Sequence, residues 1–213
     1  MSKFMGSSIT KKLVMALAGI FLLLFLPVHL GINFLLLNED PVPFNEAAHF
    51  MATFPPIKIF EVVLLLTFLI HIVWGIILQI QNWMARPVGY KVTNYSQTSF
   101  FSKFMIYTGG IVLIFLVIHF INFYLMKLGM VEGDPENFYK EAHDLFQLPG
   151  YLAFYLFSFV ILGFHLHHAF QSAFQTLGWN HHKYTPAIKA IGLIYSIIIP
   201  LGFFIIPILI YLK

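Results

Sequence analysis

The sequence predicts an all-α integral membrane protein: five transmembrane helices in a single domain over residues 1–213. Composition is the first evidence, because 59% of the 213 residues are hydrophobic and only 10% are charged, whereas soluble domains carry about 25% charged residues. Mean hydropathy is +0.83. The apolar runs are continuous and do not alternate with polar residues, which favours helices over a barrel.

Five runs are long enough to cross a bilayer, at 13–37, 59–80, 104–126, 148–173 and 191–212. The first follows a basic segment, as in a signal peptide, but it is too long for the apolar region of one and is interpreted as a retained helix. The first and third connections each carry apolar residues at helical spacing, around Phe44–Phe54 and Phe138–Leu145. These two connections are predicted to be amphipathic surface helices.

Charge distribution predicts the orientation. All nine acidic residues lie in the first and third connections or at the adjoining span end, and eight of the twelve basic residues lie in the amino-terminal tail and in the second and fourth connections. The positive-inside rule then puts the amino terminus in the cytoplasm and the carboxyl terminus outside. The net charge of +3 is too small to indicate nucleic-acid binding.

Histidines inside the spans indicate the chemistry, since an ionisable residue within a membrane is costly and usually functional. With no cysteine in the chain, metal chemistry on it falls to imidazole. At 1.5 Å per residue, His29 and His119 lie roughly 24–25 Å from the inner surface, and His71 and His165 roughly 15–17 Å from it. We therefore predict two pairs, His29 with His119 outside and His71 with His165 inside, each holding one haem iron.

Other polar residues are weaker candidates. Asn33 and Asn122, one turn outward from the outer ligands, are interpreted as contacts for propionates or a quinone, or as interhelical hydrogen bonders. His168 is a candidate propionate contact, and His167 is expected on another face of its helix. His49 and His143 are expected to be solvated. No catalytic residue is identified. A zinc site is disfavoured because the spans offer no carboxylate or thiolate at mid-depth.

The sequence of spans one and two weakly resembles that of spans three and four. Aligning the two halves matches His29 with His119 and His71 with His165, the same pairs that depth predicts. Taken in order, PVHLGINF, FNEAAHFM, IHIVWG, VIHF and GFHLHHAFQS resemble the single-polypeptide, two-haem cytochrome b subunit of succinate:quinone oxidoreductases, a group that includes succinate dehydrogenases and fumarate reductases. The resemblance covers nearly the whole chain. It implies haem b ligation by His29, His71, His119 and His165.

The resemblance also implies partners and a location. An FAD flavoprotein and an iron–sulfur subunit would carry the dicarboxylate chemistry and dock on the inner face of a bacterial cytoplasmic membrane. Quinone, expected to be menaquinone, would react near the outer haem, with Asn33, Glu46 and His49 chosen from position only. Basic and aromatic residues are expected to form the docking face: Trp83, Arg86, Lys91, Lys103, Trp179 and Lys183.

Two alternatives stay open at this point. One is the cytochrome b subunit of a hydrogenase or formate dehydrogenase, which would use the same imidazole chemistry. The other is a haem-free transporter or scaffold with polar histidines in its core.

Overall fold

The computed structural model describes residues 8–84 and 104–213, and all regular structure within these ranges is helical. The elements in order are α2 (Ser8–Asn33), η1 (Phe34–Leu37), α3 (Val42–Thr53), α4 (Pro55–Met84), α6 (Met105–His119), η2 (Phe120–Leu125), α7 (Phe138–Gln147), α8 (Pro149–Thr176) and α9 (Thr185–Tyr211). Of the two short elements, η1 is a 3₁₀-helix and η2 is a π-helix. The all-α prediction is confirmed.

Five helical stretches are long and apolar enough to span a membrane: Ile9–Leu37, Pro55–Met84, Met105–Leu125, Pro149–Thr176 and Thr185–Tyr211. They match the five predicted spans and make this a multi-pass membrane protein. Four of them extend further than predicted at one or both ends. The prediction counted apolar residues, whereas helical hydrogen bonding continues through polar residues near the ends such as Lys11, Lys58 and Lys189.

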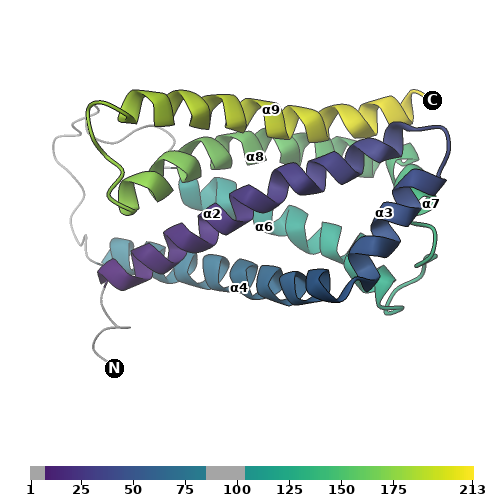
Figure 1. The fold of residues 1–213 in the computed structure, drawn as a ribbon, viewed down its shortest axis with the longest axis horizontal. Helices are drawn as coiled ribbons and strands as arrows, with labels where there is room; N and C mark the ends of the chain where they lie inside the picture. Colours follow the sequence, from purple (N-terminus) through teal and green to yellow (C-terminus); the bar gives the residue numbers. More distant parts are fainter. Residues whose placement is uncertain (1–7, 85–103) are drawn as a thin grey trace.

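The long helices run side by side, and α2 crosses the others obliquely (Figure 1). Four of them form a bundle in which α2 packs against α4 and α8, and α6 packs against α8. α4 and α6 complete the ring with little mutual contact. Consequently α2 lies across the bundle from α6, and α4 lies across it from α8.

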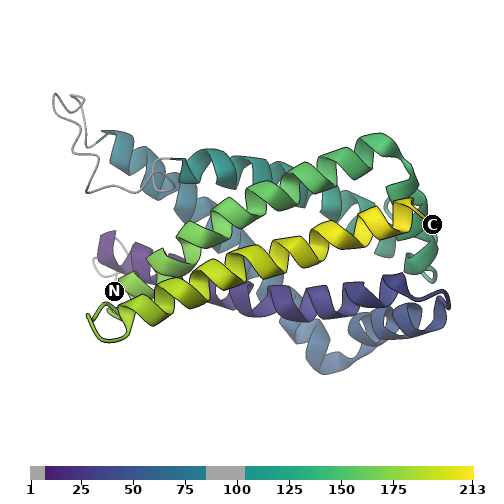
Figure 2. The same cartoon turned by 90° about the horizontal axis from the view of Figure 1, so that it is seen from above.

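The fifth long helix, α9, covers the outside of the bundle and packs mainly on α8, with smaller contacts to α7 and α2 (Figure 2). Two glycines permit this close approach. A Cβ at Gly192 would come within 2.7 Å of the Phe170 ring, and one at Gly202 would come within 2.7 Å of Leu30. Apolar side chains from the packed helices form one core, which includes the nearly inaccessible Ile210 and Tyr155.

The two short helices α3 and α7 lie together at one end of the bundle, as the apolar spacing of both connections predicted (Figure 1). Asn45 joins them: its Nδ2 donates to Asn137 Oδ1, and its Oδ1 accepts from the backbone N–H of Tyr139. His143 is not simply solvated as expected, because its Nε2 lies 3.1 Å from the Leu36 carbonyl and its ring stacks on Tyr139. We call this the α3/α7 end.

Candidate functional site

The four predicted ligand histidines meet in two pairs across the bundle. The rings of His29 on α2 and His119 on α6 have centroids 5.9 Å apart. Those of His71 on α4 and His165 on α8 are 6.5 Å apart. Each pair joins helices on opposite sides of the bundle, so both sites lie on its interior axis. These are the partners expected from depth along the spans.

Each pair has dimensions that suit one metal ion. A metal sits about 2 Å from a ligating imidazole nitrogen, so two rings sharing one ion have centroids about 6 Å apart. The interplanar angles are 81° and 78°. Two rings on one ligand axis can adopt any angle about it, so near-perpendicular planes fit. Ring spacing alone also fits ordinary edge-to-face packing. The residues around each pair distinguish a ligand site from such packing.

Glycine on a neighbouring helix makes room for each ring of the His71–His165 pair. A Cβ at Gly19 on α2 would lie 3.7 Å from His71 Cε1, and one at Gly109 on α6 would lie 3.4 Å from His165 Cε1. The two glycines precede His29 and His119 by ten residues each. The same ten-residue spacing of glycine and histidine therefore occurs in both halves of the chain, as the weak repeat suggested. Ten helical residues rise about 15 Å, which is the distance between the two pairs along the helices.

Aromatic rings surround the His29–His119 pair. Phe25 stacks on His29 at 5.1 Å, and Phe115 stacks on His119 at 5.6 Å. Phe123 and Tyr155 also contact His119. The Nδ1 of His119 is buried and has no hydrogen-bond partner among the described residues, and the same is true of Nδ1 of His71 in the other pair. Buried polar atoms normally have a partner, so both rings are candidates for binding a further group.

The helix changes form directly after His119. α6 ends at that residue and the π-helix η2 begins at Phe120. π-segments are rare and frequently occur at functional sites. This π-helix could not be predicted from the sequence, because Phe120–Leu125 is an ordinary apolar run.

The two asparagines have different partners. Asn33 Nδ2 donates to the carbonyl of His29 at 2.8 Å and lies 3.4 Å from Nδ1 of that ring, so it bonds within α2. Asn122 Nδ2 donates to the Tyr155 hydroxyl on α8 at 3.4 Å, the interhelical alternative. Propionate contacts by Asn33, Asn122 or the half-buried His168 stay predictions.

The suggested quinone residues do not converge. His49 lines a cavity of about 190 Å³ at the α3/α7 end, together with Asn45 and Lys127. Neither Asn33 nor Glu46 lines that cavity, and Glu46 is exposed. The structure thus brings one of the three to this cavity, and the other two do not line it.

The sequence analysis did not predict one polar cluster, which is centred on Glu61. There, Glu61 was used only as one of the acidic residues that indicate the orientation. Its carboxylate accepts from the Tyr124 hydroxyl and from Lys127 Nζ, both at 2.8 Å, and Lys58 Nζ lies 3.5 Å away. The cluster ties α4 to the end of the third span, where the two helices otherwise make little contact. An acid inside an apolar run was the available signal.

Among the described residues, no three His, Asp or Glu side chains converge as a multi-ligand metal site would require. The two histidine pairs lie outside that definition. The chain was also compared with protein-family models, curated proteins and solved structures, and none of them matches it.

Proposed function

We propose that this chain is a two-haem cytochrome b that anchors a succinate:quinone oxidoreductase in the bacterial cytoplasmic membrane. The single observation that carries the proposal is the convergence of four intramembrane histidines into two diagonal pairs of metal-ligand dimensions. Four histidines serving only as interhelical hydrogen bonders would not need to meet ring to ring at two heights. The enzyme family rests on the sequence resemblance.

In this proposal His29 and His119 hold one iron, and His71 and His165 hold the other. When bound, haem with two imidazole ligands has no open coordination position and supplies electron transfer in place of oxygen binding. Other residues of the chain make room for the ligand rings and exclude water from them. Gly19 and Gly109 leave room for the imidazoles of one pair, and the rings of Phe25, Phe115 and Phe123 keep water from the other.

The partners and the orientation belong to the same proposal. The amino terminus is cytoplasmic, and the FAD flavoprotein and iron–sulfur subunit dock at the end away from α3 and α7. Trp179 and Lys183 at that end are exposed, as is Trp83 near the end of α4. Arg86, Lys91 and Lys103 lie outside the described residues. Quinone, expected to be menaquinone, reacts near the α3/α7 end.

The test is purification from native membranes in mild detergent. Pyridine haemochrome analysis is expected to give about two haems b per chain, the number of bis-imidazole sites. Mass spectrometry of the co-purified subunits is expected to find a flavoprotein and an iron–sulfur protein. Hydrogenase or formate dehydrogenase subunits would instead identify the other cytochrome b function. A colourless protein would overturn both and favour the transporter or scaffold.

A further inference from the structure

A groove on the outside of the four-helix bundle lies apart from the interior that holds the two histidine pairs. It has a volume of about 460 Å³ and lies between α8 and α9. Ligand sites typically measure about 300–1,000 Å³ and combine apolar walls with a few placed polar groups. The walls are almost entirely apolar and include three aromatic side chains, Phe159, Phe164 and Phe204.

The polar groups of the groove lie deep within the apolar helices. His167 lines it from nine residues before the end of α8 at Thr176, facing away from His165 as expected, and its Nε2 lies 3.4 Å from Gln171 Nε2. On the opposite wall, Pro200 has no N–H to donate to the carbonyl of Ser196, four residues earlier in α9. The groove therefore has an imidazole on the α8 side. The Ser196 carbonyl, without its usual helical donor, lies beside Gly163 of α8, where a Cβ would come within 3.1 Å of it.

Depth restricts the occupant. Phospholipid headgroups stay at the membrane surface, so only acyl chains of lipids reach the level of His167, and they form no hydrogen bonds. A flat, lipid-soluble molecule with ring oxygens would use both the imidazole and the aromatic walls. From Phe159 to His167 the groove extends along about 12 Å of α8, long enough for such a ring and the start of an apolar tail.

Phe159 connects this groove to the His29–His119 pair. Its ring contacts Phe115 at 5.5 Å and Phe203 at 5.7 Å. Phe115 stacks on His119, and Phe203 lies 5.7 Å from His29. Two rings in series, Phe159 and then Phe115 or Phe203, thus separate the groove from that pair. A molecule in the groove would lie close to the proposed electron path, on the opposite side of α8.

We propose that the groove between α8 and α9 is a binding site for a membrane quinone, distinct from any site at the α3/α7 end. The ligand class rests on the proposed function, and the site itself rests on the groove, His167 and the Phe159 connection. Hydrogen bonding by His167 orients the quinone ring, and the apolar tail leaves the groove along the lipid-facing surface.

The test uses the full chain, purified in detergent, with a photoreactive benzoquinone carrying an isoprenoid tail. Crosslinked peptides should map to α8 and α9. Ile197 lines the groove and is 54% exposed, whereas its neighbour Ile198 is 58% exposed and does not line it. Ile197→Trp should fill the groove and reduce labelling at least about fivefold, while Ile198→Trp should label like the unmodified chain.

His167 provides the second pair of variants. His167→Leu should weaken quinone competition about fivefold, the loss of one hydrogen bond, whereas His167→Gln keeps a donor and should stay close to the unmodified chain. Equal labelling of the two isoleucine variants would overturn the proposal. So would unchanged competition in His167→Leu, or competition by phospholipid as strong as by quinone, which would indicate an acyl-chain groove.

Haem is measured in the same samples, so the two proposals can fail separately. Labelled protein without haem would contradict the cytochrome function and leave the groove assignment standing. Haem-containing protein without groove labelling would do the reverse.

Discussion

The His29–His119 pair and the His71–His165 pair lie in one bundle at different heights, and their surroundings differ. The first pair is packed among aromatic rings and adjoins a π-helix, and Pro27 lies inside α2 two residues before His29. The second lies in the uninterrupted helices α4 and α8, with its rings against glycine backbone. The two halves of the chain therefore have similar spacing but hold their histidine rings in two ways. Aromatic rings enclose the first pair in irregular helices, and glycines leave a recess for the rings of the second pair in regular helices.

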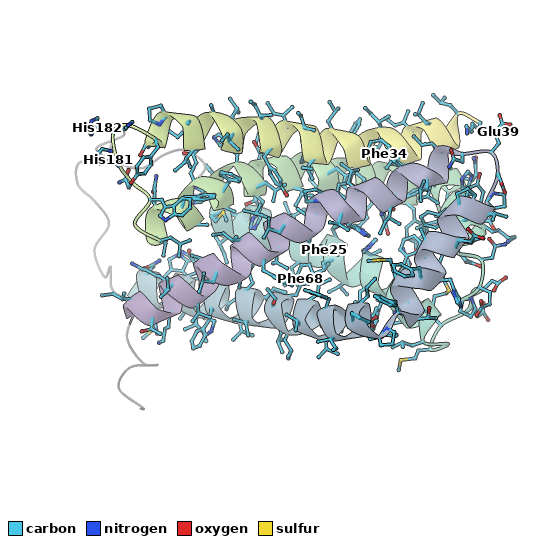
Figure 3. The ribbon with its side chains drawn as sticks, viewed as in Figure 1. Phe25, Phe34, Glu39, Phe68, His181 and His182 are labelled. Carbon is cyan, nitrogen blue, oxygen red and sulfur yellow. The ribbon has the colours of Figure 1, made fainter. Side chains whose placement is uncertain are left out.

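Removing a ligand gives the largest effect and tests whether the pairs are separate centres. His29→Ala or His119→Ala should abolish the first centre, and His71→Ala or His165→Ala the second. Pyridine haemochrome analysis should then fall from about two haems per chain to about one, because each bis-imidazole site needs both rings. His181→Ala, in the exposed turn between α8 and α9, is the control (Figure 3). Loss of a haem in His167→Ala but not in His165→Ala would contradict the assignment on α8.

A matched pair of glycines tests the recess. Gly109→Leu should displace His165 and lose most of the second centre, since a Cβ there already lies 3.4 Å from the ring and further atoms overpack it. A Cβ at the adjacent Gly110 meets nothing within 4 Å, so Gly110→Leu should keep two haems. The haem content of the two variants, measured from their spectra, shows whether the recess is needed. Equal loss in both would mean that bulk on α6 matters and the recess does not.

The Glu61 cluster belongs to the half of the bundle that holds His29 and His119. Glu61→Gln removes a charge from an ion pair with Lys127 whose side chains are both only 19% exposed. We expect a loss of about 1–2 kcal/mol, measured as a lower thermal midpoint in detergent. Asp144→Asn breaks the exposed Lys140–Asp144 pair and should leave the midpoint unchanged. A matching drop in both variants would show that exposure does not govern these pairs.

The smallest effect concerns the aromatic enclosure. Tyr155→Phe keeps the buried ring beside His119 but removes the hydroxyl that accepts from Asn122. The expected loss is about 1 kcal/mol, the net value of one hydrogen bond. It should appear in the thermal midpoint without a change in haem content. If haem were lost, the hydroxyl rather than the ring would be what positions His119.

Much of this arrangement follows from local rules. Run length gave all five spans, and a fixed rise per residue gave the depths that pair His29 with His119 and His71 with His165. The residues that contact these histidines on neighbouring helices could not be predicted from the sequence. That Gly109 lies against His165, or that His167 faces α9, depends on how helices rotate about their axes, and apolar residues on every face of a span leave that rotation undetermined. The π-helix after His119 also depends on packing, because it changes hydrogen bonding without changing composition.

Since each pair takes one ring from the first two long helices and one from the next two, synthesis of the chain sets the order in which the pairs become possible. The His29–His119 pair has both its members once α6 has entered the membrane. The His71–His165 pair must wait for α8. The biogenesis of this protein is therefore staged: a nascent chain that stops before α8 can complete one of the two sites at most.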